Sequence, residues 1–385
     1  MISDLVVFLQ RPPRKKTLLM SSVSYVNRRS FLRTVTAAAA SVGLSAATAK
    51  RMAAAVARGQ RPSVIWLHYQ ECTGCTESLL RTSHPGLAEL VLDLISLDYH
   101  ETLMAAAGHQ AEAALQSAIT RNAGKYILIV EGAIPLAIRG NYMRIGGRTG
   151  IQAVTEVAKS AALTIAIGSC ASWCGLPSAD PNPTGAVGVA EVLKGTKVIK
   201  LPGCPANPYI LLGVALEFAT MGKLPALDDQ GRPLFAYGRT IHEHCPRRPH
   251  FDAGRFAVRF GDDGHRQGYC LYKLGCKGPA THASCSTNQF CEVVDAWPIG
   301  LGAPCFGCTE QKLAFRAPMY QTVEIARPQP PATYPGITAE RGSVSGVATG
   351  LAGLAAGAIL GASSKVARML KDKKAAEEGA EDIEP

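Results

Sequence analysis

Glu71-Cys72-Thr73-Gly74-Cys75-Thr76-Glu77-Ser78 is the stretch around which this chain is organised. It follows the apolar run 63–69, Ser-Val-Ile-Trp-Leu-His-Tyr, which has the composition of a buried strand. A helical pattern follows from 78 to about 94. A Cys-x-x-Cys pair at the carboxyl tip of a strand can hold a metal centre or form a redox disulfide, and the pair alone leaves both open.

Strands and helices alternate from residue 60 to about residue 224. This alternation predicts an α/β fold in which helices cover both faces of a parallel sheet. The predicted strands are 64–69, 126–130, 163–167 and 197–201. The predicted helices are 78–94, 109–121, 151–159 and 186–193.

Three of the predicted strands end at cysteines, at Cys72 and Cys75, at Cys170 and at Cys204. The loops beyond the carboxyl ends of parallel strands meet in one crevice, so these distant cysteines can converge there. Four thiolates at one site suit a [4Fe–4S] cluster or a structural zinc ion.

The alternation stops at about residue 224, where glycine, proline and cysteine become frequent. A segment with so little regular structure needs covalent or metal crosslinks to order it. We therefore predict a second domain over 226–327, folded around metal centres. Its cysteines are Cys245, Cys270, Cys276, Cys285, Cys291, Cys305 and Cys308.

The chain has 385 residues and a formal charge of +10, which could suggest a nucleic-acid partner. Residues 1–49 carry seven of the basic residues and one acidic residue. The remaining positive charge is dispersed, with no basic block before the C-terminal tail. We therefore expect no binding of nucleic acid.

A twin-arginine pattern, Asn-Arg-Arg-Ser-Phe-Leu-Arg, occupies 27–33 and precedes an uncharged stretch at 34–49. Small residues at 47–49 offer a cleavage site. The pattern predicts that 1–49 is a twin-arginine export signal that is removed. The alternative is a basic patch in front of a buried helix.

The other end carries an uncharged run at 343–364, followed by five basic residues between Lys365 and Lys374. About 20 apolar residues span a bilayer, and a basic flank marks the cytoplasmic side. The pattern predicts a linker at 328–342, a transmembrane anchor at 343–364 and a cytoplasmic tail at 365–385. The body would then lie on the periplasmic face of the cytoplasmic membrane. The alternative is a core helix built of small residues.

Three interpretations of the 12 cysteines compete: disulfides, zinc sites and iron–sulfur clusters. An oxidising compartment favours disulfides, but proteins exported by the twin-arginine route fold around their cofactors first. Zinc fits a single Cys-x-x-Cys pair, whereas ligands drawn from three strand tips are unusual for a zinc ribbon. The spacing favours iron–sulfur clusters and leaves the other two open.

Six motifs resemble, in order, those of the small subunit of [NiFe]-hydrogenases, in the membrane-bound uptake branch typified by the hydrogenase-2 type of enteric bacteria. They are the stretch at 71–78, Gly-Ser-Cys-Ala-Ser-Trp at 168–173, Pro-Gly-Cys-Pro at 202–205, Ile-His-Glu-His-Cys-Pro-Arg-Arg at 241–248, Tyr-Cys-Leu-Tyr-Lys-Leu-Gly-Cys-Lys-Gly-Pro at 269–279, and the segment from Trp-Pro at 297–298 to Cys-Phe-Gly-Cys at 305–308. The resemblance implies an α/β fold with a flavodoxin-like parallel-sheet domain at 61–225, a loop-rich iron–sulfur domain at 226–327 and the C-terminal transmembrane helix.

The resemblance also implies three ligand sets. A proximal [4Fe–4S] cluster would take Cys72, Cys75, Cys170 and Cys204. A distal [4Fe–4S] cluster would take His242, Cys245, Cys270 and Cys276, with His244 as the less favoured imidazole. A medial [3Fe–4S] cluster would take Cys285, Cys305 and Cys308, because Pro298 stands at the fourth corner and has no side-chain donor.

Cys174 and Cys291 remain, and we expect both to be small buried hydrophobes. Oxygen-tolerant members of the family carry two extra cysteines, and the matching positions here are Gly74 and Gly175. The resemblance therefore implies a standard proximal cluster.

By resemblance the chain is the electron-transfer subunit of a hydrogenase and carries no catalytic residue of its own. Electrons from H2 oxidation at the NiFe(CN)2CO centre of a large subunit would pass through the three clusters to a membrane, quinone-linked acceptor. The implied partners are that large subunit and either a membrane cytochrome b or a ferredoxin-like protein with an integral-membrane quinone-reducing subunit. A regulatory hydrogen-sensing subunit and an exported binding protein stapled by zinc or disulfides are the alternatives.

Overall fold

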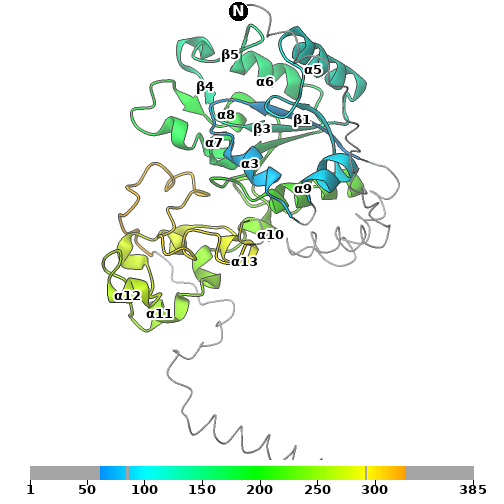
Figure 1. Ribbon diagram of the computed structural model, residues 1–385. Coiled ribbons are helices and arrows are strands. Elements are labelled where there is room, and N and C mark those ends of the chain that lie inside the picture. Colours follow the sequence, from blue (N-terminus) through cyan, green and yellow to red (C-terminus); the bar gives the residue numbers. More distant parts are fainter. Residues whose placement is uncertain (1–60, 84–85, 291–292, 326–385) are drawn as a thin grey trace, which may run out of the picture. The chain divides into compact units, whose positions relative to one another are not determined.

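The computed structural model describes residues 61–83, 86–290 and 293–325 (Figure 1). These residues all belong to one compact unit. The predicted signal at 1–49, the linker, the anchor, the tail and Cys291 lie outside the described residues.

A five-stranded parallel sheet forms the centre of the first 165 or so described residues, in the order β2-β1-β3-β7-β9. This is the 2-1-3-4-5 order of flavodoxin-like folds. Four of its strands are the predicted ones, with ends shifted by a residue at most, and the edge strand β2 was not predicted. The strands are β1 (Ser63–His68), β2 (Ser96–His100), β3 (Ile127–Glu131), β7 (Leu163–Ile167) and β9 (Val198–Leu201).

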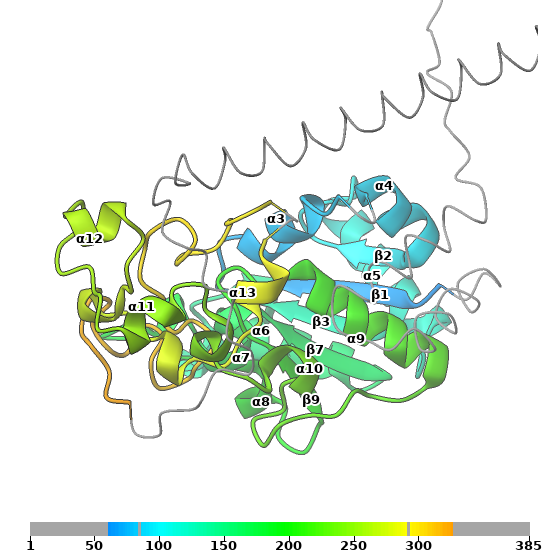
Figure 2. The ribbon, with the colours of Figure 1, turned by 90° about the horizontal axis from the view of Figure 1, so that it is seen from below.

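Helices cover both faces of the sheet. On one face α3 and α9 pack against Trp66, Ile129 and Ile165, and on the other α5 and α6 pack against Leu67 and Leu128 (Figures 1 and 2). Alternate strand residues therefore point to two separate cores, which explains the continuous apolar runs. The helices are α3 (Gly74–Leu80), α4 (Leu87–Glu89), α5 (His109–Arg121), α6 (Gly150–Ala158), α7 (Gly168–Trp173), α8 (Val189–Val192) and α9 (Pro208–Met221).

The predicted helix at 78–94 is divided into α3, α4 and a π-helical turn, Leu90–Leu94. Pro85 lies inside the predicted range, and proline disrupts a helix interior because it has no amide donor. In contrast, α6 begins where Thr149 and Gln152 form a capping box. Short strands complete this region, β4 (Ile134–Pro135) with β8 (Ala186–Val187) and β5 (Arg144–Ile145) with β6 (Arg148–Thr149).

From residue 234 to residue 325 the described chain is built of short helices and loops around its own small core, which contains Ile241, Leu271, Trp297 and Ile299. This agrees with the predicted loss of regular structure. The helices are α10 (Leu234–Tyr237), α11 (Arg248–Asp252), α12 (Asp263–Arg266) and α13 (Cys285–Asn288), with 3-10 turns at Ile241–His244, Tyr272–Leu274 and Gly278–Ala280.

One part of the predicted fold class is corrected. Within the described ranges no helix is both long enough and apolar enough to cross a membrane, against the transmembrane helix that the sequence predicts at 343–364. That predicted segment itself lies outside the described residues. The run is rich in glycine, alanine and serine, which contribute little hydrophobic surface, and glycine lowers helix propensity.

Candidate metal centres

The carboxyl ends of the central strands are level with one another. His68 pairs with Glu131, Glu131 with Ile167, and Ile167 with Leu201. The loops that follow these strands therefore start at one edge of the sheet, as the sequence predicts.

The first cavity lies at this edge, and Cys72, Cys75, Cys170 and Cys204 all line it. Cys75 is buried, Cys170 is half-buried, and Cys72 and Cys204 are exposed. Burial raises the pKa of the Cys170 thiol to about 12 and also raises the pKa of the Cys75 and Cys204 thiols. The four predicted proximal residues thus share one site.

Glycine is required beside this cavity at Gly168, the first residue of α7. Its φ is +81°, and a Cβ atom there would lie 2.6 Å from the Cys75 sulfur. A Cβ atom at Gly74 would lie 3.1 Å from the Cys72 sulfur, and one at Gly175 would lie 2.8 Å from the Cys170 sulfur. The two positions matched to the extra cysteines of oxygen-tolerant enzymes therefore face cysteines of the first cavity.

Glu131, at the tip of β3, holds the start of α3 in place and was not predicted. The residue is 2 % exposed, and its Oε1 accepts hydrogen bonds from the amides of Cys75 (3.0 Å) and Thr76 (3.4 Å). Its Oε2 accepts from the Thr76 hydroxyl (2.7 Å) and from Nε1 of Trp66 (3.1 Å). A carboxylate that ends a run of apolar residues is the sequence signal that points to such a role.

The second cavity is lined by Cys285, Cys305 and Cys308, together with Pro298. Cys204 of the first cavity lines this one too, so the two cavities are neighbours. Burial raises the pKa of the Cys285 thiol to about 12 and raises the pKa values of Cys305 and Cys308 as well. The three predicted medial cysteines and the predicted open-corner residue are brought together.

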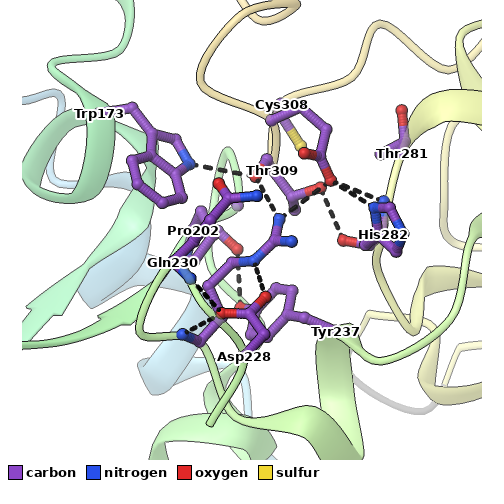
Figure 3. A network of polar contacts seen from close by, with 12 residues as sticks. Trp173, Pro202, Asp228, Gln230, Tyr237, Thr281, His282, Cys308 and Thr309 are labelled. Carbon is purple, nitrogen blue, oxygen red and sulfur yellow. Dashed lines mark hydrogen bonds and ion pairs between the residues drawn. The ribbon is translucent and has the colours of Figure 1, made fainter.

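A buried polar network, which we call the Arg232 clamp, fixes the segment that carries Cys308 (Figure 3). Arg232 is 2 % exposed; its Nη1 donates to the Thr309 carbonyl (3.0 Å) and to Glu310 (2.9 Å), and its Nε donates to Asp228 (2.7 Å). The Trp173 indole donates to the same Thr309 carbonyl (3.1 Å). The clamp ties the second cavity to the sheet domain.

The third cavity is lined by His242, Cys245, Cys270 and Cys276. Burial, reinforced by the nearby Arg248 guanidinium, lowers the pKa of His242 to about 4, so its ring is neutral at pH 7 and keeps a free lone pair. His244 does not line the cavity and instead lies 3.0 Å from Nη1 of Arg239. Ile241 lines both the second and the third cavity.

Lys277 follows Cys276 of the third cavity, donates its amide to the carbonyl of Cys305 in the second, and is fully buried. Its ammonium donates to the carbonyls of Pro318 and Met319, each at 2.8 Å. Burial lowers the pKa of Lys277, and ionised sulfurs of Cys305 and Cys276 would raise it. In turn, burial raises the pKa of the Cys276 thiol, and the Lys277 ammonium acts against that rise, so its charge favours the thiolate that binds metal.

The donor chemistry fits iron–sulfur clusters. Each of the 11 cysteines in the described part of the chain is free. Ten of them line the three cavities, and the raised pKa values mean that crowded neighbouring thiols become thiolates only when a metal displaces the protons. Cys174 stands apart: it is buried, and Nη2 of Arg316 lies 3.4 Å from its sulfur.

A parallel sheet with a series of cysteine-lined cavities leading away from its carboxyl edge defines an α/β protein built to hold metal centres. Two family models cover most of the described chain. One is "NADH ubiquinone oxidoreductase, 20 Kd subunit", which matches 72–218. The other describes the C-terminal region of the "NiFe/NiFeSe hydrogenase small subunit" and matches 237–321.

Among its relatives, the hydrogenase-2 small chain of Escherichia coli K12 is 50 % identical over 346 residues, 90 % of this chain and 93 % of that one. The uptake hydrogenase small subunit of Azotobacter vinelandii is 47 % identical over 77 % of this chain and 82 % of that one. A solved [NiFeSe]-hydrogenase from Desulfomicrobium baculatum matches with a TM-score of 0.64 and 34 % identity, covering 68 % of this chain and all of that one.

The chain belongs to the small subunits of [NiFe]-hydrogenases. It is the electron-transfer subunit of an oxidoreductase, of a family that carries iron–sulfur clusters, and it pairs with a hydrogenase large subunit.

Proposed function

We propose that this chain relays electrons, released by H2 oxidation in the large subunit, through three iron–sulfur clusters to a membrane, quinone-linked acceptor. The observation that carries the proposal is the order of the cavities. The first shares Cys204 with the second, and the second shares Ile241 with the third, so the sites form one uninterrupted series. Bound clusters supply one-electron carriers in such a series.

The assignment of cluster types rests on the donors available in each cavity. Four thiols in the first cavity support a proximal [4Fe–4S] cluster held by Cys72, Cys75, Cys170 and Cys204. Three thiols beside Pro298 support a medial [3Fe–4S] cluster held by Cys285, Cys305 and Cys308.

The third cavity supports a distal [4Fe–4S] cluster held by His242, Cys245, Cys270 and Cys276. An imidazole carries no charge, so one imidazole among three thiolates makes the site less negative and raises its potential. A higher potential suits the end of the series, where electrons leave for an external acceptor.

The proposed compartment draws on the names of relatives and on the sequence, and the proposed acceptor draws on the resemblance alone. A 47 %-identical relative in Nitratidesulfovibrio vulgaris is a periplasmic [NiFe] hydrogenase small subunit, and that of Azotobacter vinelandii belongs to an uptake hydrogenase. With the twin-arginine pattern at 27–33, these support export to the periplasm. By resemblance, the electrons then pass to a cytochrome b or to a ferredoxin-like protein with its quinone-reducing membrane subunit.

Electron paramagnetic resonance of the purified heterodimer, with metal analysis, tests the clusters. We expect a [3Fe–4S] signal in the oxidised protein, [4Fe–4S] signals on reduction with H2, and iron with inorganic sulfide in place of zinc. Zinc in the cavities, or an oxidised protein without a [3Fe–4S] signal, would refute the proposal.

Export is tested separately by replacing Arg28 and Arg29 with lysine, which keeps the charge but removes the guanidinium pair. The variant should accumulate in the cytoplasm with its clusters in place. Undiminished periplasmic activity would show that the pattern is not an export signal.

A further inference from the structure

A single buried hydroxyl, that of Ser169, joins the backbones of the first and second cavities. Ser169 is 1 % exposed and is the second residue of α7. Its Oγ donates a hydrogen bond to the carbonyl oxygen of Cys308 at 2.7 Å, across 139 positions of sequence. The same Oγ accepts a hydrogen bond from the amide of Gly203 at 3.1 Å.

Each of these contacts lies at or next to a cavity cysteine. Ser169 precedes Cys170, and Gly203 precedes Cys204, and both cysteines line the first cavity. Cys308 lines the second. The Ser169 amide also donates to the Gly203 carbonyl at 2.8 Å, so the tips of β7 and β9 are held together and one hydroxyl connects both to Cys308.

We propose that Ser169 is a positioning residue that fixes the separation between the proximal and medial clusters, and thereby the rate at which an electron passes between them. This inference rests on the proposed function. The rate of electron tunnelling falls steeply with each ångström added between the two clusters. A hydroxyl that links Gly203, the residue before Cys204, to Cys308 limits that distance and so acts directly on the rate. Because Ser169 is 1 % exposed, alanine at this position leaves the Cys308 carbonyl and the Gly203 amide without their hydroxyl partner in a largely buried place.

The fold does not depend on this hydroxyl. The Arg232 clamp holds the next residue, Thr309, through the Trp173 indole and the Arg232 guanidinium (Figure 3). Without the Ser169 hydroxyl, the segment that carries Cys308 and Thr309 therefore stays attached to the sheet domain through Thr309. Within that segment, only Cys308 loses a contact. Ser169→Ala also removes volume rather than adding it, so the variant should fold.

Ser172 provides a matched control on the same helix. It is 4 % exposed, and its hydroxyl donates to the Ala166 carbonyl at 3.2 Å, a contact that touches no cavity cysteine. Trp173→Phe is a second control, because it removes a donor to Thr309 and leaves the Ser169 bonds intact. Ser172→Ala shows the effect of losing a buried serine hydroxyl that is not part of the bridge. Trp173→Phe shows the effect of weakening the hold on Thr309 while the Ser169 bridge is kept.

The experiment uses the cluster-loaded heterodimer and compares the wild type with Ser169→Ala, Ser172→Ala and Trp173→Phe. Magnetic interaction between the two clusters is read, in the H2-reduced protein, from the splitting and relaxation of the proximal [4Fe–4S] signal. H2-dependent dye reduction gives kcat and KM, and iron content confirms equal loading.

In Ser169→Ala we expect an altered magnetic interaction and a severalfold lower kcat at unchanged KM for H2 and unchanged iron content. Ser172→Ala should keep wild-type values, and Trp173→Phe should show a smaller change than Ser169→Ala, because the Arg232 guanidinium still holds the Thr309 carbonyl. A wild-type interaction in Ser169→Ala, or the same change in Ser172→Ala, would overturn the inference and leave the proposed function standing. A wild type without proximal and medial signals would overturn both.

Discussion

The amide nitrogen of Lys277 donates a hydrogen bond to the carbonyl oxygen of Cys305 at 2.7 Å. Lys277 follows Cys276 of the third cavity, and Cys305 lines the second, so this bond joins the backbones of two neighbouring sites. The Lys277 side chain is fully buried, and its ammonium donates to the carbonyls of Pro318 and Met319.

Replacing Lys277 with methionine should lower the reduction potentials of the medial and distal clusters. The ammonium stabilises the more negative, reduced state of each, and methionine has similar length without the charge. Redox titration followed by paramagnetic resonance measures the shift. Lys273, which is exposed and lies over the Phe256 ring, is the control, and Lys273→Met should leave both potentials unchanged. Equal shifts in the two variants would contradict a local role for Lys277.

Pro298→Cys should convert the medial cluster towards [4Fe–4S], because it adds a thiol to a cavity that three cysteines already line. The [3Fe–4S] signal of the oxidised protein should disappear. Pro298→Ala, which adds no donor, should keep the signal. The same spectrum in Pro298→Cys and Pro298→Ala would show that residue 298 does not stand where a fourth ligand of the medial cluster would bind.

Gly168→Ala should destabilise the protein and reduce its iron content. Gly168 has a φ of +81° and Gly195 has a φ of +85°, so alanine brings about 1–2 kcal/mol of backbone strain at either position. Only at Gly168 does the added Cβ meet the Cys75 sulfur, at 2.6 Å, whereas nothing lies within 4 Å at Gly195. Thermal denaturation and iron analysis of Gly168→Ala and Gly195→Ala separate the effect of the contact with the Cys75 sulfur from the effect of backbone strain. Full iron content in Gly168→Ala would show that the first cavity adapts.

Glu101 should make stability depend on pH. Burial raises its pKa from 4.5 to about 7, so the folded state favours the neutral carboxyl. The contribution of Glu101 to the free energy of unfolding is therefore largest below pH 4.5, where the carboxyl is neutral in both states. It is lost as the pH rises through 7, because this carboxyl ionises more readily in the unfolded chain. The side chain of the Glu101→Gln variant stays neutral at every pH. At pH 8 the free energy of unfolding of this variant should exceed that of the wild type by at most about 3 kcal/mol.

Thermal denaturation between pH 5 and pH 8 measures this effect. Glu77, an exposed carboxylate that lies 3.8 Å from Arg81, is the control, and Glu77→Gln should follow the wild-type profile. A Glu101→Gln variant that loses stability with pH as the wild type does would contradict the prediction.

The central sheet was predictable because its strands are apolar on both faces and end at recognisable turns. The run 163–167 forms β7 with the predicted ends. The edge strand β2 was missed because its sequence, Ser-Leu-Asp-Tyr-His, is half polar and only half-buried. Helix α9 was missed for the opposite reason: it is apolar around most of its circumference, so no helical period is visible in its sequence.

The cysteines that gather in each cavity were predicted as sets, but the residues that hold these sets were not. Glu131 acts on Cys75 from 56 positions away, and Ser169 acts on Cys308 from 139 positions away. Such contacts depend on which strands become neighbours, and neither residue belongs to a recognisable ligand spacing. His242 lines the third cavity and His244 does not, and the choice of His242 as the imidazole ligand of a distal cluster stays a prediction.

The neighbouring arrangement of the three cavities also has a consequence for biosynthesis. The first cavity has its last cysteine at Cys204, the third at Cys276, and the second, which lies between them in space, at Cys308. On the ribosome the two outer cavities therefore acquire their complete sets of cysteines before the central one does. In the proposed relay, the central site would therefore be the last one whose set of cysteines is complete.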